Sequence, residues 1–206
     1  APLSWPDGND RVPYWIYTDQ GNYERELEKI FYGPVWNYVG LECEIPNPGD
    51  FKRTQIGDQS IIVVRDAEGS VNAPVNRCAH RGVKICEQDK GSFSEIMCPY
   101  HQWTYDLKGN LQGVPFNRGV KGNGGMPADF SMADNGLDVL KVHVRNGGIF
   151  ATMSDKTPPF ETYMGNRILG YYDRELDGRS LSLLGHSRQR IGANWKLMLE
   201  NIKDTH

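Results

Sequence analysis

The stretch Cys78-Ala79-His80-Arg81-Gly82, together with Cys98-Pro99-Tyr100-His101-Gln102-Trp103, decides how this chain folds. Its cysteines and histidines follow the pattern C-x-H-x17-C-x2-H, so each short segment supplies one thiolate and one imidazole. Thiolates and imidazoles are metal ligands, and two loops that each carry one of each kind can clamp a metal centre between them. We therefore expect the fold to bring these four side chains to one place.

The four expected ligands are Cys78, His80, Cys98 and His101. A Rieske-type [2Fe-2S] cluster needs this mixture, because two thiolates bind one iron and two imidazoles bind the other. Structural zinc is the alternative, since a set of two cysteines and two histidines also suits a tetrahedral ion. Zinc fingers, however, usually place both cysteines on one knuckle and both histidines on a helix. One cysteine and one histidine in each loop therefore favour the [2Fe-2S] cluster.

The composition limits the other possibilities. With 206 residues, 38% of them hydrophobic, the chain can bury one core and the start of a second. A net charge of −3 with interspersed signs offers no basic surface for nucleic acid. The longest aliphatic run, residues 61–64, is far shorter than the roughly 20 apolar residues that span a bilayer, and the N-terminus lacks a signal pattern. We expect a cytoplasmic protein without a membrane or nucleic-acid partner.

Two cysteines remain outside the ligand pattern. In a reducing compartment, Cys43 and Cys86 are expected to be small buried side chains rather than halves of a disulfide. The sequence leaves their pairing open.

Hydrophobic periodicity predicts a mainly β domain between two helical regions. Apolar side chains at helical spacing predict a helix over 22–31, ended by Gly33-Pro34. Short runs of β-forming residues separated by turn residues predict antiparallel strands over 35–45, 51–56, 60–65, 71–75, 103–106, 136–145 and 149–153. The last two would form a hairpin through Asn146-Gly147-Gly148. After them we expect a helix over 160–171, a strand over 180–190 and a helix from about Asn194.

These elements divide the chain into three parts. Residues 1–35 form an N-terminal helical segment, 36–155 the cluster-binding β domain, and 156–206 the beginning of a second domain. Residues 113–136 are rich in Gly, Asn and Pro and too polar for a core. They predict a surface loop, with a subunit contact as the alternative.

Three passages resemble one protein family. C-A-H-R-G at Cys78, C-P-Y-H-Q-W at Cys98 and N-W-K-L-M-L-E-N-I-K-D from Asn194 resemble the large (α) subunit of Rieske non-haem iron aromatic-ring-hydroxylating oxygenases. The resemblance covers essentially the whole chain. It implies a Rieske domain whose antiparallel sheets clamp the [2Fe-2S] cluster, with an N-terminal helix before it and the start of an α+β catalytic domain after it. In this family the catalytic domain binds mononuclear Fe(II) through two histidines and one carboxylate.

The C-terminal residues resemble the family's route for electrons. In the family's rings, the cluster of one subunit lies near the mononuclear iron of the next, and an aspartate bridges a cluster histidine and an iron-ligand histidine. Asp204 matches that aspartate, His101 is its expected cluster-side partner, and His206 is the candidate first iron ligand. The family pattern is Asp-x-Tyr-His, whereas this chain reads Asp204-Thr205-His206. Because residues two places apart on a helix do not face each other, we expect that one residue is missing before His206 and that the catalytic domain continues after it.

The resemblance implies the oxygenase component of a multicomponent system that hydroxylates an aromatic ring with O2. The passages V-P-Y-W from Val12, W-N-Y-V-G from Trp36 and E-N-I-K-D from Glu200 look most like the branch that acts on aromatic carboxylates such as terephthalate, salicylate or anthranilate. Polycyclic or other aromatic hydrocarbons are the alternative substrates, and a pure electron carrier is the alternative class. The implied partners are an NAD(P)H-dependent reductase, with or without a ferredoxin, and a small β subunit in a trimeric ring (α3 or α3β3). Whether one oxygen atom or two enter the ring is left open.

The residues beside the ligands can also be interpreted. Tyr100 and Val83 stand where respiratory Rieske proteins carry linked cysteines, so the resemblance implies the low end of the roughly −150 to +300 mV range of such clusters. Trp103 is expected to pack in the core, with a cover for the cluster as the alternative. Three nearby cations could dock an acidic electron donor or form a solvated face, namely Arg77, Arg81 and Lys84. Elsewhere in the chain, His143 and His186 are expected to be structural.

Overall fold

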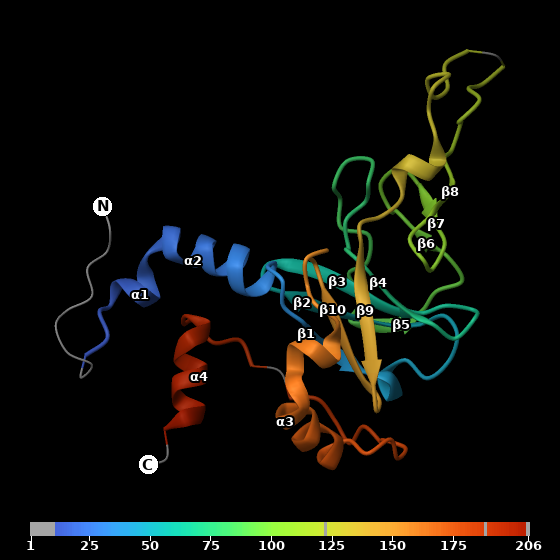
Figure 1. Ribbon diagram of the computed structural model, residues 1–206. Coiled ribbons are helices and arrows are strands. Elements are labelled where there is room, and N and C mark those ends of the chain that lie inside the picture. The colour runs from blue at the N-terminus through green and yellow to red at the C-terminus, as the bar shows by residue number, and fades with distance from the viewer. Residues whose placement is uncertain (1–10, 122, 188, 205–206) are drawn as a thin grey trace.

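Two antiparallel β-sheets form the body of the computed structural model, which describes residues 11–121, 123–187 and 189–204 (Figure 1). The larger sheet has the strand order β1-β10-β9-β4-β3-β2-β5, and the smaller has the order β6-β7-β8. The larger sheet comprises β1 (Asn37–Leu41), β2 (Asp50–Ile56), β3 (Gln59–Arg65), β4 (Val71–Pro74), β5 (Lys90–Ser92), β9 (Val139–Arg145) and β10 (Gly148–Thr152). The smaller comprises β6 (Ile96–Met97), β7 (Thr104–Tyr105) and β8 (Leu111–Gly113). The predicted mainly β, antiparallel fold is confirmed.

The strand β3 shows how the larger sheet is buried on both faces. Its residues 61–64 are all fully buried. Ile61 and Val63 belong to one core, whereas Ile62 and Val64 pack with Phe51 in another. Side chains alternate between the two faces of a strand, so a continuous aliphatic run suits a strand covered on both sides. Within the described residues, no helix is long and apolar enough to cross a membrane.

The β9–β10 hairpin forms as predicted. Arg145 pairs with Gly148, so the turn consists of Asn146 and Gly147. Both turn residues have positive φ angles, 48° and 85°, which is the backbone that an Asn-Gly type I′ turn adopts. This hairpin places β10 between β1 and β9, and buried side chains of both its strands belong to the core that contains Ile61 and Val63.

Two aspartate-centred turns hold neighbouring parts of the sheets. The buried Asp66 carboxylate accepts hydrogen bonds from the backbone N–H groups of residues 68 and 70. Asp106 accepts the same two bonds from residues 108 and 110, in the turn that joins β7 to β8. Lys108 and Glu68 then form an ion pair of 3.0 Å between the two turns. The turn that follows the second cluster loop is therefore tied to the larger sheet.

The helical segments agree in part with the prediction for both ends of the chain. A short helix α1 (Trp15–Thr18) precedes α2 (Gln20–Glu26), which continues as a π-helical turn η1 (Leu27–Phe31). The predicted helix over 22–31 therefore begins earlier, because Asp19 caps it by accepting a hydrogen bond from the Asn22 N–H over 2.6 Å. Helix α3 (Phe160–Glu175) is kinked at Gly165, and α4 (Trp195–Lys203) is capped by the Asn194 side chain.

Two sequence predictions are wrong. The predicted strand over 180–190 does not form in its described residues, 180–187 and 189–190. The backbone of these residues joins neither sheet, and Leu184 is completely exposed. The predicted strand over 35–45 is also too long, because β1 ends at Leu41 and the chain turns into the 3-10 helix η2 (Glu42–Glu44).

Residues 114–121 and 123–131 belong to a long excursion that ends in the 3-10 helix η3 (Met132–Asn135). It projects away from both sheets, and Phe116 on it is 74% exposed (Figure 1). The base of the excursion is different, because Val114, Met126 and Phe130 pack against the core beneath the cluster loops. The predicted polar surface loop is therefore confirmed, but its base belongs to the site described next.

Candidate iron-sulfur site

The two predicted ligand loops share one pattern of backbone hydrogen bonds. In the first, the N–H of Cys78 donates to the Val83 carbonyl over 2.8 Å, and the N–H four residues after Cys78 donates back to the Cys78 carbonyl over 2.8 Å. In the second, the N–H of Cys98 donates to the Trp103 carbonyl over 2.9 Å, and the N–H of Gln102 donates back to the Cys98 carbonyl over 3.0 Å. Each loop therefore closes on its own cysteine and holds its histidine inside the turn.

The fifth residue of each loop has a left-handed backbone. In the first loop it is Gly82, with φ of 70°, which glycine adopts without steric cost. In the second it is Gln102, with φ of 57°, which is unusual for a residue with a Cβ atom. The shared hydrogen-bond frame imposes the same conformation on two different residues.

The two cysteine sulfurs lie together in the interior. Cys78 is 4% and Cys98 1% exposed, both belong to one buried cluster, and burial and the Cys78 thiol raise the pKa of the Cys98 thiol. The N–H groups of Tyr100 and His101 point at the Cys98 sulfur and lower that pKa. On the other side, the Tyr105 hydroxyl lies 3.3 Å from the Cys78 sulfur. Donors aimed at sulfur stabilise negative charge there, which is what iron-bound thiolates and sulfides need.

The two imidazoles also lie together. The ring centroids of His80 and His101 are 4.7 Å apart at 68°. The Nδ1 atom of His80 is buried, and no hydrogen-bond partner for it exists in the described part of the chain. Burial lowers the pKa of His80, and the nearby His101 and Arg81 lower it further, so the neutral imidazole that binds metal is favoured.

The surroundings of the two imidazoles differ. The His80 ring stacks on the buried Trp103 ring at 4.6 Å and 6°, and Trp103 in turn meets the edge of Phe130 at 5.8 Å. The His101 ring lies instead against Tyr100 at 3.8 Å, and Tyr100 is 58% exposed. Both sequence interpretations of Trp103 apply, because it is core and also covers a ligand.

The donors fit a dinuclear cluster better than a single ion. They form a pair of sulfurs and a pair of imidazoles, each pair able to bind one iron. The unpaired His80 nitrogen and the donors around the sulfurs therefore match a [2Fe-2S] cluster.

Two of the three cations that lie near the loops form ion pairs. Arg77 forms an ion pair with Asp138 at 3.2 Å, and Lys84 forms one with Glu87 at 2.8 Å. Within the described residues, Arg81 is exposed and has no ion pair. This supports the solvated-face interpretation for the first two. The sequence reasoning missed Asp138 and Tyr105 because neither carries a motif, although Tyr105 is only seven residues beyond Cys98.

The structure does not bring the predicted electron-bridging residue to the cluster loops within this chain. Asp204 is exposed and caps the end of α4, on the opposite side of the molecule from β6 and β7, which flank the second loop (Figure 1). His206 lies outside the described residues. Asp204 therefore cannot approach His101 of its own chain in this arrangement, as expected if the bridge forms between subunits.

The remaining predicted residues have ordinary surroundings. His143 stacks on Phe160 at 4.4 Å and packs α3 onto the sheet, as expected for a structural histidine. His186 is more than half exposed and lies 3.6 Å from Glu44. Cys43 and Cys86 are both free thiols, and of the two only Cys86 is fully buried.

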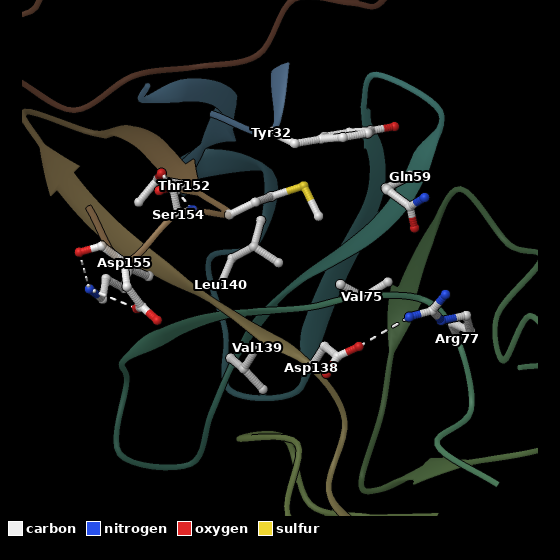
Figure 2. Close-up of a pocket in the computed structure, with 12 residues that line it drawn as sticks. Tyr32, Gln59, Val75, Arg77, Asp138, Val139, Leu140, Thr152, Ser154 and Asp155 are labelled. Atoms are coloured by element: carbon white, nitrogen blue, oxygen red, sulfur yellow. Dashed lines mark hydrogen bonds and ion pairs between the residues drawn. The ribbon is translucent and has the colours of Figure 1, made fainter. Parts of the chain in front are cut away.

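A separate hollow of about 530 Å³ lies along β9 and the ends of β4 and β10 (Figure 2). Val75 and Leu140 form part of its apolar floor. The charges on its rim are paired, Arg77 with Asp138 and Lys141 with Asp155 at 2.9 Å. None of the four cluster ligands lines it, so it is distinct from the candidate iron-sulfur site.

Comparison with known proteins gives the same result for the loops. Residues 35–123 match the Rieske [2Fe-2S] domain family. The chain is 55% identical to the large oxygenase component of salicylate 5-hydroxylase from Ralstonia sp., over 98% of this chain and 49% of that protein. It is 47% identical to the large subunit of anthranilate 1,2-dioxygenase from Burkholderia cepacia, over 97% of this chain and 47% of that protein.

A solved structure supports the fold. Naphthalene 1,2-dioxygenase from Rhodococcus sp. superposes with a TM-score of 0.79 at 34% identity, covering 92% of this chain and 42% of that one. The chain spans about half the length of the curated relatives it matches. The chain therefore contains a Rieske [2Fe-2S] domain, and along nearly its whole length it is similar to the large subunits of these oxygenases.

Proposed function

We propose that this chain provides the Rieske domain of an oxygenase large subunit that hydroxylates an aromatic carboxylate. The observation that carries the proposal is the convergence of two sulfurs and two imidazoles in loops with matching backbone frames. The substrate class rests on the likeness to relatives named for salicylate and anthranilate. Hydroxylation of an aromatic hydrocarbon is the second candidate, because the naphthalene dioxygenase has a similar fold.

We assign the cluster ligands by the two donor pairs. Cys78 and Cys98 would bind one iron, and His80 and His101 the other. Residues 36–155 would form the Rieske domain, preceded by the helical segment 1–35. Residues 156–206 would begin the catalytic domain, with His206 as the first ligand of the mononuclear iron.

When bound, the cluster supplies one-electron transfer and a mononuclear Fe(II) supplies O2 activation. The chain's own residues set the conditions for this chemistry. Tyr105 and the N–H groups of Tyr100 and His101 stabilise negative charge on the sulfurs. Trp103 covers the His80 side of the site and excludes water from it, because it is buried and stacked on that ring.

Asp204 would connect the cluster of one subunit to the iron of the next. Its exposed position at the end of α4 leaves the carboxylate free to accept hydrogen bonds from histidines of two subunits. A trimeric ring, α3 or α3β3, would bring it to His101 of a neighbour. Replacing Asp204 with Asn should leave both metals bound and slow electron transfer between them.

The proposed partners are a reductase that takes electrons from NAD(P)H, with or without a ferredoxin, and a small β subunit. The names of the relatives, a large oxygenase component and a large subunit, are those of parts of multicomponent systems. A pure electron carrier is less consistent with the structure. Helix α4 exposes Leu197, Met198 and Leu199 by 40% to 48%, which a free-standing carrier would leave in water.

The test uses the full-length protein with a reductase and NADH. Salicylate, anthranilate and terephthalate should each be compared with naphthalene for hydroxylated product and for coupled NADH consumption. Product from a carboxylate alone supports the proposal, and product from naphthalene alone favours the hydrocarbon. Reduction of the cluster without product from any of the four would favour the electron carrier.

A further inference from the structure

The N-terminal helices contact helix α4 through a carboxylate that is nearly buried. Glu26, at the end of α2, accepts hydrogen bonds from the Lys196 ammonium over 2.6 and 2.8 Å and from the Trp195 indole N–H over 2.9 Å. The side chains of Glu26 and Lys196 are only 11% and 18% exposed. These contacts join residues 169 and 170 positions apart in sequence. A pair this sheltered is costly to break, because removing one partner leaves the other charge without compensation.

A second group of contacts lies beside the first. The Tyr17 hydroxyl donates to both carboxylate oxygens of Glu200, over 2.7 and 2.9 Å. The Asn194 side chain donates to the Tyr17 carbonyl over 3.2 Å while also capping α4. The Phe31 ring meets the edge of Trp195 at 5.3 Å. Helix α4 is therefore held at its first turn and along one side by α1, α2 and η1.

The other side of the N-terminal segment is anchored to the Rieske domain. The Tyr23 hydroxyl donates to the Asp58 carboxylate over 2.7 Å, which raises the Tyr23 pKa to about 12. The backbone N–H of Asp58 donates to the Tyr32 hydroxyl over 2.9 Å. Asp58 belongs to the turn between β2 and β3. The segment thus connects the sheet that carries the cluster loops to α4, which lies beside α1 and α2 (Figure 1).

Among the described residues, few other contacts fix the position of helix α4. None of its residues is buried, and Ile202 near its end is 65% exposed. Asp204 follows directly as its C-terminal cap. Any tilt of α4 would therefore displace Asp204, and the Glu26 contacts at the first turn oppose such a tilt.

We infer that Glu26 is a positioning residue, which holds α4, and with it Asp204, in a fixed place relative to the Rieske domain. This inference rests on the proposed function of Asp204 as the electron bridge. In a symmetric ring, the position of α4 relative to its own Rieske domain also fixes its distance from the neighbouring cluster. A residue 178 positions before Asp204 would then control the rate at which one electron leaves the reduced cluster for the mononuclear iron.

The test compares Glu26→Gln with Glu28→Gln. Both substitutions remove one negative charge from the same helical segment, but Glu28 is exposed and has no hydrogen bond to α4 in the described structure. Amide hydrogen exchange of residues 195–203 in the full-length protein should become about tenfold faster in Glu26→Gln and stay unchanged in Glu28→Gln. Combining Glu26→Gln with Lys196→Met should add little to that change, because both substitutions remove the same contact.

The second readout is electron transfer in the full-length protein. After reduction of the cluster with dithionite and mixing with O2 and substrate, cluster reoxidation should be about tenfold slower in Glu26→Gln, with iron content and the visible cluster spectrum unchanged. Unchanged exchange in α4 would overturn the inference that Glu26 holds the helix. Faster exchange with unchanged reoxidation would overturn its role in placing Asp204.

A parallel Asp204→Asn protein separates this inference from the proposed function. If Asp204→Asn reoxidises its cluster at the normal rate, the bridge itself is wrong, and the electron-transfer part of the inference falls with it. The exchange experiment still decides whether Glu26 holds α4, because it does not depend on either metal.

Discussion

The two cluster loops have the same backbone and different surroundings. Each closes with the same two hydrogen bonds and has a left-handed fifth residue. In the first loop, the His80 ring stacks on the buried Trp103, and Cys78 lies against the Tyr105 hydroxyl. In the second loop, the His101 ring lies against the exposed Tyr100, although Cys98 is as deeply buried as Cys78.

This difference shows that the backbone of the loops and the surroundings of the ligands have separate roles. The backbone frame holds the cysteine and the histidine of each loop near each other, and it depends on local turn geometry. The surroundings decide which ligand is shielded and which lies near solvent and a partner. The His80 side is covered by the stacked Trp103 and Phe130 rings, whereas the His101 side lies beside an exposed tyrosine, which agrees with the proposed exit of the electron on the His101 side.

The largest effect should come from removing a ligand, and it should be equal in both loops. Cys78→Ser and Cys98→Ser should each abolish the cluster, because iron loses a thiolate that neither loop can replace. The measurement is iron and acid-labile sulfide per chain, with the visible absorption spectrum. Cys86→Ser is the matched control, since Cys86 is also a buried free thiol but lies outside the site. Loss of the cluster in Cys86→Ser alone would contradict the ligand assignment.

The second largest effect should distinguish the aromatic ring beside His80 from the aromatic ring beside His101. Trp103→Ala should lower the free energy of unfolding by about 3–5 kcal/mol, because it empties a buried site beside His80. Tyr100→Ala should lower it by only about 0.5 kcal/mol, because Tyr100 is mostly exposed. Chemical denaturation monitored by the cluster absorption gives both values. Equal losses would mean that the ring stacked on His80 is no more buried than the ring beside His101.

A smaller effect should appear in the reduction potential. Tyr105→Phe removes the hydroxyl 3.3 Å from the Cys78 sulfur, and with it a stabilisation of the more negative, reduced cluster. If that hydrogen bond is about 1 kcal/mol stronger in the reduced state, the one-electron potential should fall by about 40 mV. A spectroscopic redox titration measures the change. Tyr100→Phe, which removes a hydroxyl from the second cluster loop, should leave the reduction potential nearly unchanged.

The smallest effect should come from the left-handed position of the second loop. Gln102→Gly removes backbone strain of about 1 kcal/mol at φ of 57°, but it also makes the unfolded chain more flexible by a similar amount. The free energy of unfolding should therefore change by less than about 1 kcal/mol, with the cluster intact. The reverse test, Gly82→Gln in the first loop, should destabilise the protein by about 1 kcal/mol. A large loss in Gln102→Gly would show that the Gln102 side chain stabilises the loop.

Local patterns in the sequence predicted much of the fold. The Asn146-Gly147 turn, the aliphatic strand around residues 61–64 and the start of α4 near Asn194 depend on a few neighbouring residues, and all three form as expected. The strand expected over 180–190 failed, because a strand needs an edge to pair with and nothing within the segment shows whether one is available.

The sequence by itself determined the donor set, because ligand chemistry and the spacing within each loop are local properties. Only the tertiary structure decided the environment of each donor. Phe130 contacts Trp103 from a distant excursion, Asp138 forms an ion pair with Arg77 from the residue before β9, and Glu26 contacts Lys196 across 170 positions of the chain. Such contacts depend on how separate elements pack together, and no local pattern in the sequence records that packing.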